Sequence, residues 1–280
     1  MTSTYSDVVE TARTYYNSDN ADSFYSLVWG GEDIHIGTYQ KQDDSIFEAS
    51  RRTVQELAKL LSLDSHTKLL DIGSGYGGTA RYLVKEYGCH VDCLNLSETQ
   101  NQRNRNLNQA EGMADNITVI DGSFESIPAK DGVYDIVISQ DAILHSGNRI
   151  QVFREVERVL KPSGEFLFTD PMEQGNCPKS VLQPVLDRIH LDSMGSFDFY
   201  IKTAESLGLE TVQVVDLSDH LVAHYRRVGQ EIDSKLEALL TVCSKEYIEK
   251  MKMGIGHWVT GGEAGHLTWG ILHFKKPCPV

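Results

Sequence analysis

The stretch from Leu69 to Gly78, which reads LLDIGSGYGG, places the strongest limits on how this chain can fold. Its apolar beginning is typical of the end of a buried parallel strand, and the residues from Thr79 to Lys85 predict a helix. Glycines are needed between the two because the backbone must turn there with positive φ or lie directly against a ligand. A helix that begins at such a turn presents free N–H groups, so the stretch predicts a nucleotide-binding unit of an α/β fold.

The glycine spacing by itself is compatible with more than one ligand. Gly73, Gly75 and Gly78 satisfy the dinucleotide pattern G-x-G-x-x-G, which many loops match by chance, and Gly77 is an extra glycine. An NAD site and a glycine turn that binds nothing therefore stay open on spacing alone. The run D-I-G-S-G-Y-G-G resembles the first motif of the class I S-adenosylmethionine-dependent methyltransferases. That resemblance implies S-adenosyl-L-methionine as cofactor, with Asp71 facing its methionine end.

Composition narrows the class of partner. The 280 residues fit one large α/β domain or a core with a cap, and the net charge of −14 argues against nucleic acid or an anionic membrane, which both need a basic surface. The five cysteines form no C-x-x-C and indicate neither a disulfide framework nor a zinc knuckle. The sequence has no apolar leader and no apolar run of membrane-spanning length. We therefore expect a cytoplasmic monomer or homodimer that acts on a small molecule.

Helical and strand patterns alternate along the rest of the chain. Helical periodicity covers 6–28, with a break at 17–20, and returns at 45–62, 148–160, 196–207 and 219–252. Strand patterns lie at 90–96, 116–120, 133–139, 165–170, 210–217 and 267–274. With the methyltransferase resemblance, they imply a Rossmann-like α/β fold with a mostly parallel seven-stranded sheet. Five parallel strands would be followed by a sixth and a hairpin-like seventh.

The N-terminal block has no strand pattern of its own. We expect residues 1–62 to form a helical lid over the glycine turn, and residues 63–280 to form the methyltransferase core with cap segments around 172–195 and 219–262. The methyltransferase resemblance puts such a lid over the cofactor, which makes four of its side chains candidate cofactor contacts: Tyr16, Trp29, Ile34 and His35. The alternative is that the aromatic ones only pack the lid against the core.

Further cofactor contacts are expected where the strands end. An acidic residue at the end of the second strand commonly binds the ribose hydroxyls of a nucleotide, but Asn95 stands there, and it could accept one hydroxyl or merely turn the chain. The segment 121–128 resembles the methyltransferase adenine-binding turn. The remaining expected cofactor contacts are Leu96, Gly122, Ser123, Phe124 and Gln140.

Asp141 and His145 are the candidate catalytic residues. They follow the fourth strand, and ligands of open α/β sheets lie outside the carboxyl ends of the strands. In a helical turn their i,i+4 spacing would put both side chains on one face, where the carboxylate could orient the imidazole as a general base. Alternatively, Asp141 caps a turn and His145 is a core histidine.

Two narrower resemblances concern the acceptor. The run S-Q-D-A-I-L-H resembles the segment that carries the Asp–His pair of phosphoethanolamine N-methyltransferases. The run V-W-G-G-E-D-I-H-I-G, with C-L-N-L-S, resembles the glycine/sarcosine/dimethylglycine N-methyltransferases of betaine synthesis over most of the chain, and is most like the sarcosine/dimethylglycine members. Both resemblances imply methylation of a small amine by direct in-line displacement.

Charge favours the second resemblance. A buried phosphate needs two or more basic side chains, and 253–266 contains no lysine or arginine. The sequence therefore predicts methylation of sarcosine or dimethylglycine to give betaine, an osmoprotectant, with a phosphoethanolamine-type enzyme as the alternative. A methyltransferase-like domain that binds nucleotide without catalysis is the rival from another class.

One cation could hold the substrate carboxylate, and the cap offers three candidates: Arg188, His190 and Arg226. A quaternary ammonium product would favour an aromatic pocket, for which Tyr25 and Trp258 are available together with Tyr16 and Trp29. The glycines of 253–266 predict a mobile flap or close approach to a small substrate. His220 and His224 are spaced like metal ligands on a helix, but no third ligand is evident, and we expect no metal.

Overall fold

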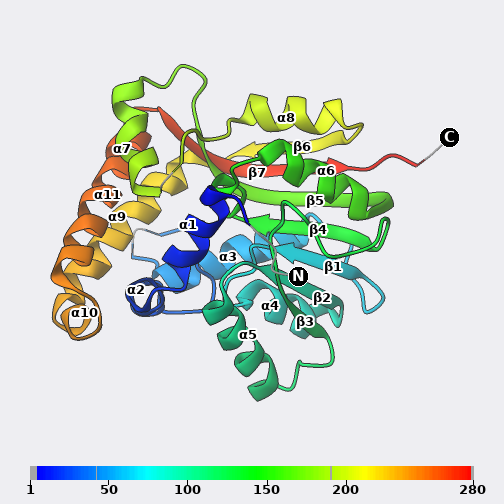
Figure 1. Cartoon of the computed structure of the whole chain (residues 1–280), viewed down its shortest axis with the longest axis horizontal. Helices are drawn as coiled ribbons and strands as arrows, with labels where there is room; N and C mark the ends of the chain where they lie inside the picture. The colour runs from blue at the N-terminus through cyan, green and yellow to red at the C-terminus, as the bar shows by residue number, and fades with distance from the viewer. Residues whose placement is uncertain (1–4, 42, 190, 279–280) are drawn as a thin grey trace.

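The structure is a computed structural model that describes residues 5–41, 43–189 and 191–278. These residues contain a seven-stranded sheet in the order β3-β2-β1-β4-β5-β7-β6 (Figure 1), in which β7 alone runs antiparallel to its neighbours. The strands are β1 (Lys68–Ile72), β2 (His90–Asn95), β3 (Ile117–Asp121), β4 (Tyr134–Gln140), β5 (Leu160–Glu173), β6 (Glu210–Asp216) and β7 (Leu267–Lys275). The expected class I methyltransferase sheet is confirmed, although β5 is longer at both ends than its pattern predicted.

Helices cover both faces of the sheet because its central strands are apolar on both sides. Leu70 packs against α6 (Arg149–Val159) and α8 (Phe197–Ser206), whereas Leu69 packs against α3 (Ile46–Lys59) and α4 (Gly78–Tyr87). Successive side chains of a strand point to opposite faces, so one strand serves two cores. The helix α5 (Glu98–Ala110) contacts β2 and β3.

The N-terminal lid begins with α1 (Asp7–Tyr16) and α2 (Asp19–Trp29). The predicted break between them is confirmed, because the Ser18 hydroxyl accepts the backbone N–H of Ala21 as an N-cap. Phe24 and Val28 of α2 join a hydrophobic cluster with Val228 and Ile255 of the later helices. The lid is therefore packed on helices that follow β6.

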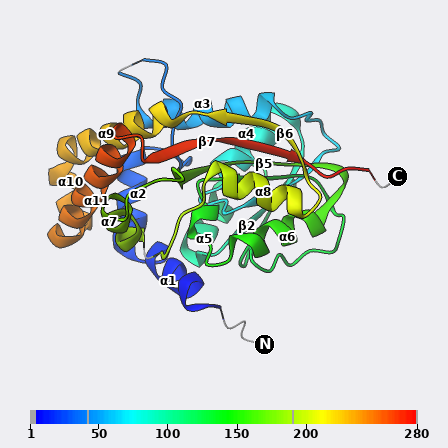
Figure 2. The same cartoon turned by 90° about the horizontal axis from the view of Figure 1, so that it is seen from above.

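Four helices gather at one end of the molecule beside α2, as both views show (Figures 1 and 2). They are α7 (Lys179–Ile189), α9 (Ser218–Ser234), α10 (Leu236–Val242) and α11 (Lys245–Glu263). The last three form one excursion between β6 and β7. The N–H of Leu217 donates to the carbonyl of Trp269 at 2.8 Å, so the chain leaves and re-enters the sheet at neighbouring positions.

The flap predicted for 253–266 is wrong, because α11 continues to Glu263. Its glycines allow close packing instead of movement. A Cβ at Gly261 would lie 2.7 Å from the Leu267 side chain, and one at Gly262 would lie 2.6 Å from Val222 of α9. Among the described residues, no helix is both long and apolar enough to cross a membrane.

Candidate active site

The glycine turn after β1 forms the floor of a cleft. Gly73 has φ +81° and a Cβ there would overlap the Cβ of Ala142, so both its conformation and its neighbour require glycine. Gly78 begins α4, and a Cβ there would overlap the carboxylate of Asp33 in the lid. The turn thus lets the main chain lie close to the lid on one side and to the end of β4 on the other.

The cleft lies beside β1, where the strand order changes direction between β2 and β4, the usual place for a ligand in an open α/β sheet. All but one of the expected cofactor contacts line it: Tyr16, Ile34, His35, Asp71, Gly73, Gly75, Asn95, Leu96, Gly122, Ser123, Phe124 and Gln140. The exception is Trp29, which lines a neighbouring cavity and donates its indole N–H to the carbonyl of His35 at 3.3 Å. Trp29 therefore packs next to His35 within the N-terminal segment and does not line the cofactor cleft.

Two carboxylates make the cleft acidic. Burial, and then the charge of Asp33, raise the pKa of Asp71 to about 7. Asp33, which sequence reasoning missed, is buried in the lid beside the cleft and lies 2.9 Å from Arg51. The one feature of the sequence that could have identified Asp33 is its position in the run E-D-I-H, two residues before His35. A pair of buried carboxylates is suited to a cationic group of a ligand.

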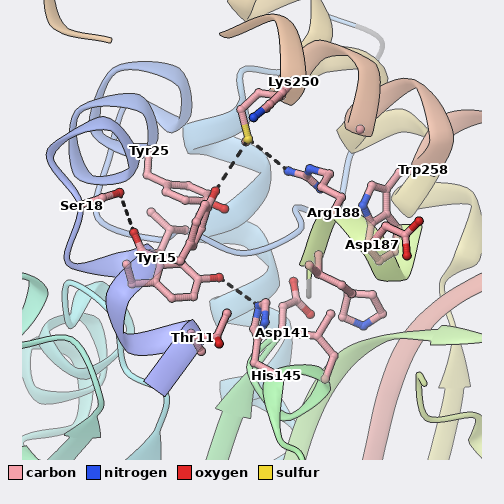
Figure 3. A pocket seen from close by; sticks show the side chains of 18 of the residues that line it. Thr11, Tyr15, Ser18, Tyr25, Asp141, His145, Asp187, Arg188, Lys250 and Trp258 are labelled. Carbon is pink, nitrogen blue, oxygen red and sulfur yellow. Dashed lines mark hydrogen bonds between the residues drawn. The ribbon is translucent and has the colours of Figure 1, made fainter. Parts of the chain in front are cut away.

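A second, larger cavity of about 1110 Å³ opens beside the cleft (Figure 3). Lid helices α1 and α2 line one side of it, and α7, α9 and α11 line the other. The tyrosines of the lid pack closely, with the ring centroids of Tyr16 and Tyr25 6.0 Å apart and those of Tyr25 and Trp29 4.9 Å apart. The cleft and the cavity share five of the predicted site residues: Tyr16, Ile34, His35, Asp141 and His145.

Asp141 does not orient His145, and that part of the prediction is wrong. The Asp141 carboxylate accepts hydrogen bonds from the Ile36 N–H at 2.6 Å, the Trp269 indole at 2.7 Å and the Thr169 hydroxyl at 2.8 Å. Asp141 has φ +53°, which turns the chain into a short 3-10 helix, η1 (Ile143–His145), rather than an α-helical turn. The i,i+4 geometry on which the pairing depended is therefore absent from this segment.

The partner of His145 is Tyr16. The Tyr16 hydroxyl lies 2.9 Å from Nε2 of His145, which is labelled beside Asp141 in Figure 3. Burial, with the charges of Arg149 and Arg188, lowers the pKa of His145 to about 4. The imidazole is consequently neutral near pH 7 and can accept a hydrogen bond from a ligand.

The candidate substrate residues have three different outcomes. Tyr25, Arg188 and Trp258 line the larger cavity, and Arg188 is half-buried there, with its Nε shielded from solvent. Arg226 is wrong as a candidate, because it is exposed on α9 and forms an ion pair with Glu263 instead. His190 lies outside the described residues.

Comparison with known proteins agrees with this geometry. Residues 70–168 match a family model described as a methyltransferase domain. The chain is 52% identical over 271 residues to a sarcosine/dimethylglycine N-methyltransferase of Aphanothece halophytica, covering 96% of this chain and 98% of that protein. It is 51% identical to the protein of the same name from Halorhodospira halochloris, covering 99% and 100% of the two chains. The chain belongs to the sarcosine/dimethylglycine N-methyltransferase family.

A crystal structure of a protein assigned as a sarcosine dimethylglycine methyltransferase from Galdieria sulphuraria matches with a TM-score of 0.90 and 46% identity. The match covers 95% of this chain and all of that one. This N-methyltransferase uses S-adenosyl-L-methionine.

The polar groups that line the cleft fit that cofactor. Asp71 and Asp33 suit its ammonium group, and the glycine turn offers backbone N–H groups. The side-chain amide of Asn95 donates to Gln100 at 3.1 Å, which leaves its carbonyl oxygen to accept from a ribose hydroxyl.

The two histidines spaced like metal ligands anchor the lid of this N-methyltransferase instead. The backbone N–H of Tyr39 donates to His220 at 3.1 Å, and that of Gly37 donates to His224 at 3.2 Å. Their i,i+4 spacing on α9 is what lets one helix face bind two nearby positions of the lid loop. No cluster of three metal-ligand side chains occurs in the part of the chain that the structure describes. His224 also lines the larger cavity, which sequence reasoning did not foresee.

Proposed function

We propose that this enzyme transfers methyl groups from S-adenosyl-L-methionine to the amine nitrogen of sarcosine and dimethylglycine, with betaine as the final product. The observation that carries the proposal is that the cofactor cleft and the aromatic cavity share His145, Tyr16 and Asp141. A donor in the cleft and an amine in the cavity would meet at these residues. Betaine would serve as an osmoprotectant in the cytoplasm, made by a monomer or homodimer that needs no nucleic acid or membrane.

The bound cofactor supplies an electrophilic methyl group on a sulfonium. The protein has to align the acceptor nitrogen with that group, and positioning alone can remove roughly 7–11 kcal/mol of barrier. The rings of Tyr16 and Tyr25 lie 6.0 Å apart and both line the larger cavity, where they can stabilise a methylated ammonium by cation–π contact. Rigid aromatic walls thus both orient the amine and tolerate its positive product.

His145 is the residue that we assign to the proton of the substrate amine. Only a neutral amine has a lone pair for attack, and a neutral imidazole can accept a hydrogen bond from its N–H. The low pKa of about 4 keeps His145 unprotonated, so it passes a proton onward rather than holding it. The hydroxyl of Tyr16 at 2.9 Å would relay that proton toward solvent, accepting it from Nε2 while releasing its own to water.

We assign Asp141 a positioning role. Its carboxylate joins the lid at Ile36 to the sheet at Thr169 and Trp269. Those three contacts hold the lid loop closed over the point where the cavities meet. The residue therefore acts on the amine through the shape of the site, not through the imidazole of His145.

A phosphobase substrate fits the cavity less well. Arg188 is half-buried there, but Lys250 stands at the rim with 70% of its side chain exposed and is paired with Glu246. A desolvated phosphate needs more than one buried cation. A carboxylate, with a single negative charge, needs one.

The test is methyl transfer from labelled S-adenosyl-L-methionine to sarcosine, dimethylglycine and phosphoethanolamine, each at matched concentration. We expect labelled product with the first two amines and none with the third. Labelling of phosphoethanolamine alone would reject the proposal. Calorimetric titration with S-adenosylhomocysteine checks cofactor binding separately, so a protein that binds cofactor but labels no amine would support the non-catalytic rival.

A further inference from the structure

Three buried N–H donors of the larger cavity have no acceptor among the described residues. They are Nε of Arg188, Nε2 of His224 and Nε1 of Trp258, and all three side chains line the cavity. A buried donor without an acceptor is destabilising, and more so when it is charged. Three such groups in one cavity indicate that an acceptor arrives there with the ligand.

Nε2 of His224 is identified as a donor from the contacts of the other ring nitrogen, Nδ1. Nδ1 lies 3.2 Å from the backbone N–H of Gly37, which can only donate, so Nδ1 carries no proton. Burial, followed by the charge of His35, lowers the pKa of His224 to about 3, and the ring is neutral. A neutral imidazole has one proton, which is therefore on Nε2.

Arg188 brings the positive charge. Its side chain is half-buried with Nε shielded from solvent, and no carboxylate of the described residues lies within ion-pair distance of it; its guanidinium donates to the sulfur of Met251 at 3.6 Å (Figure 3). The stem of Arg188 runs directly against Gly254 of α11, where a Cβ would overlap its Cδ. A guanidinium stays charged when buried, and a buried charge without a counter-ion is strongly unfavourable.

Trp258 holds the third donor in a fixed direction. Its ring stacks on Tyr225 with centroids 5.0 Å apart and an angle of 19° between the planes. Trp258 lies one turn after Gly254 on α11, so its indole is on the same helix face as the position that Arg188 contacts. Arg188, Trp258 and Lys250 are seen around the upper part of the cavity in Figure 3.

We infer that Arg188, His224 and Trp258 bind the carboxylate of the amine substrate. This inference rests on the proposed function and names the residues that select an amino acid over a simple amine. A carboxylate offers acceptor oxygens and one negative charge, which matches a charged fork and two neutral N–H donors. With the carboxylate there, the amine of a small zwitterion is directed to the tyrosines and His145.

The experiment compares dimethylglycine with its neutral amide, N,N-dimethylglycinamide. Binding of each is measured by calorimetry on the enzyme loaded with S-adenosylhomocysteine, and KM is measured for methyl transfer. For the unmodified enzyme we expect dimethylglycine to bind at least about 100-fold more tightly. Arg188→Met should weaken dimethylglycine binding by about 100-fold and abolish the preference, whereas Arg188→Lys should keep part of both.

The two neutral ring N–H donors are removed by substitutions that keep one neighbouring contact of each side chain. Trp258→Phe keeps an aromatic ring on Tyr225, and His224→Asn keeps an acceptor for the Gly37 N–H. Each should weaken dimethylglycine binding by about tenfold and leave binding of the amide nearly unchanged. Arg226→Met is the matched control, because this arginine is exposed, paired with Glu263 and outside the cavity lining.

Affinity for S-adenosylhomocysteine checks that each variant is folded. If the unmodified enzyme methylates dimethylglycine but the Arg188, His224 and Trp258 variants keep its affinity and preference, the carboxylate site is wrong while the proposed function stands. If the unmodified enzyme neither binds nor methylates dimethylglycine, the proposed function fails and the carboxylate site fails with it. The two failures are thus distinguishable.

Discussion

The hydroxyl of Tyr16 and Nε2 of His145 are 2.9 Å apart, which connects the last turn of α1 to the turn after β4. This contact joins the lid to the sheet at the place where the cofactor cleft meets the substrate cavity. The position of α1 and the placement of the imidazole are therefore coupled through this contact.

Replacement of His145 by alanine should reduce kcat by about 10²–10⁴-fold and leave the affinity for S-adenosylhomocysteine nearly unchanged, because the imidazole is assigned to the amine proton. Tyr16→Phe removes only the hydroxyl and should reduce kcat by about tenfold. Steady-state kinetics with dimethylglycine and calorimetry measure the two quantities. Turnover of the alanine variant within a few-fold of the unmodified enzyme would contradict the role of His145.

The charge state of His145 can be observed directly. Its pKa of about 4, set by burial and by two arginines, predicts that the imidazole stays neutral from pH 8 down to pH 5. An exposed histidine would titrate near pH 6.5. Ring-labelled NMR, with the His145 signals assigned by comparison with the His145→Ala spectrum, gives the midpoint. A midpoint above pH 6 would remove the argument that this ring is a neutral acceptor.

Asp71 should make cofactor binding depend on pH. Burial and Asp33 raise its pKa to about 7 in the free protein, and an ammonium ligand favours the ionised form. Binding of S-adenosylhomocysteine should thus release a proton and tighten as pH rises from 6 to 8. Asp71→Asn should weaken binding by roughly tenfold or more and flatten this dependence. Asp198→Asn, in an ion pair whose aspartate is 82% exposed, is the control that should change neither.

His224 should make stability depend on pH. Its pKa is lowered to about 3 in the folded protein, whereas an unfolded histidine titrates near 6.5. Below pH 6.5 the unfolded state binds the extra proton, so this contribution is present above pH 6.5 and is lost as pH falls toward 3. Relative to His224→Asn, the unmodified enzyme should lose about 2 kcal/mol of unfolding free energy between pH 7.5 and 5. Urea unfolding of both proteins at the two pH values measures this, and a constant difference would contradict it.

Two glycines of α11 form a matched pair. A Cβ at Gly254 would overlap Arg188, so Gly254→Ala should lower the unfolding free energy by about 1–3 kcal/mol and weaken dimethylglycine binding. A Cβ at Gly256 would meet no atom within 4 Å, so Gly256→Ala should raise the unfolding free energy by about 0.5–1 kcal/mol. Denaturant unfolding and calorimetry measure both effects. Equal behaviour of the two variants would show that Gly254 does not position Arg188.

The parts of this enzyme that the sequence predicts well depend on neighbouring residues. Alternating and continuous apolar runs define the strands, and the glycine turn after β1 must be glycine for local reasons such as the φ of +81° at Gly73. Asn17 caps the end of α1, and Ser18, the next residue, caps the start of α2. Each of these features depends only on residues within a short stretch of the sequence.

The predictions that are wrong concern side chains whose positions depend on contacts between residues far apart in the sequence. Asp141 is held by Trp269, 128 positions later, and that contact, not helical spacing, decides where its carboxylate points. Arg188 and Arg226 both belong to cap helices, but the first packs against Gly254 in the cavity, while the second pairs with Glu263 at the surface. No pattern within either helix distinguishes them.

The excursion of α9, α10 and α11 begins at Leu217 and ends beside Trp269, so its two ends are already joined by the sheet. Because its departure and return are fixed in this way, its interior can be lengthened, shortened or replaced at little entropic cost. The part of the cavity wall formed by α9 and α11 can therefore differ in length or sequence while the ends of β6 and β7 stay in place, whereas Arg188 on α7 lies outside this excursion.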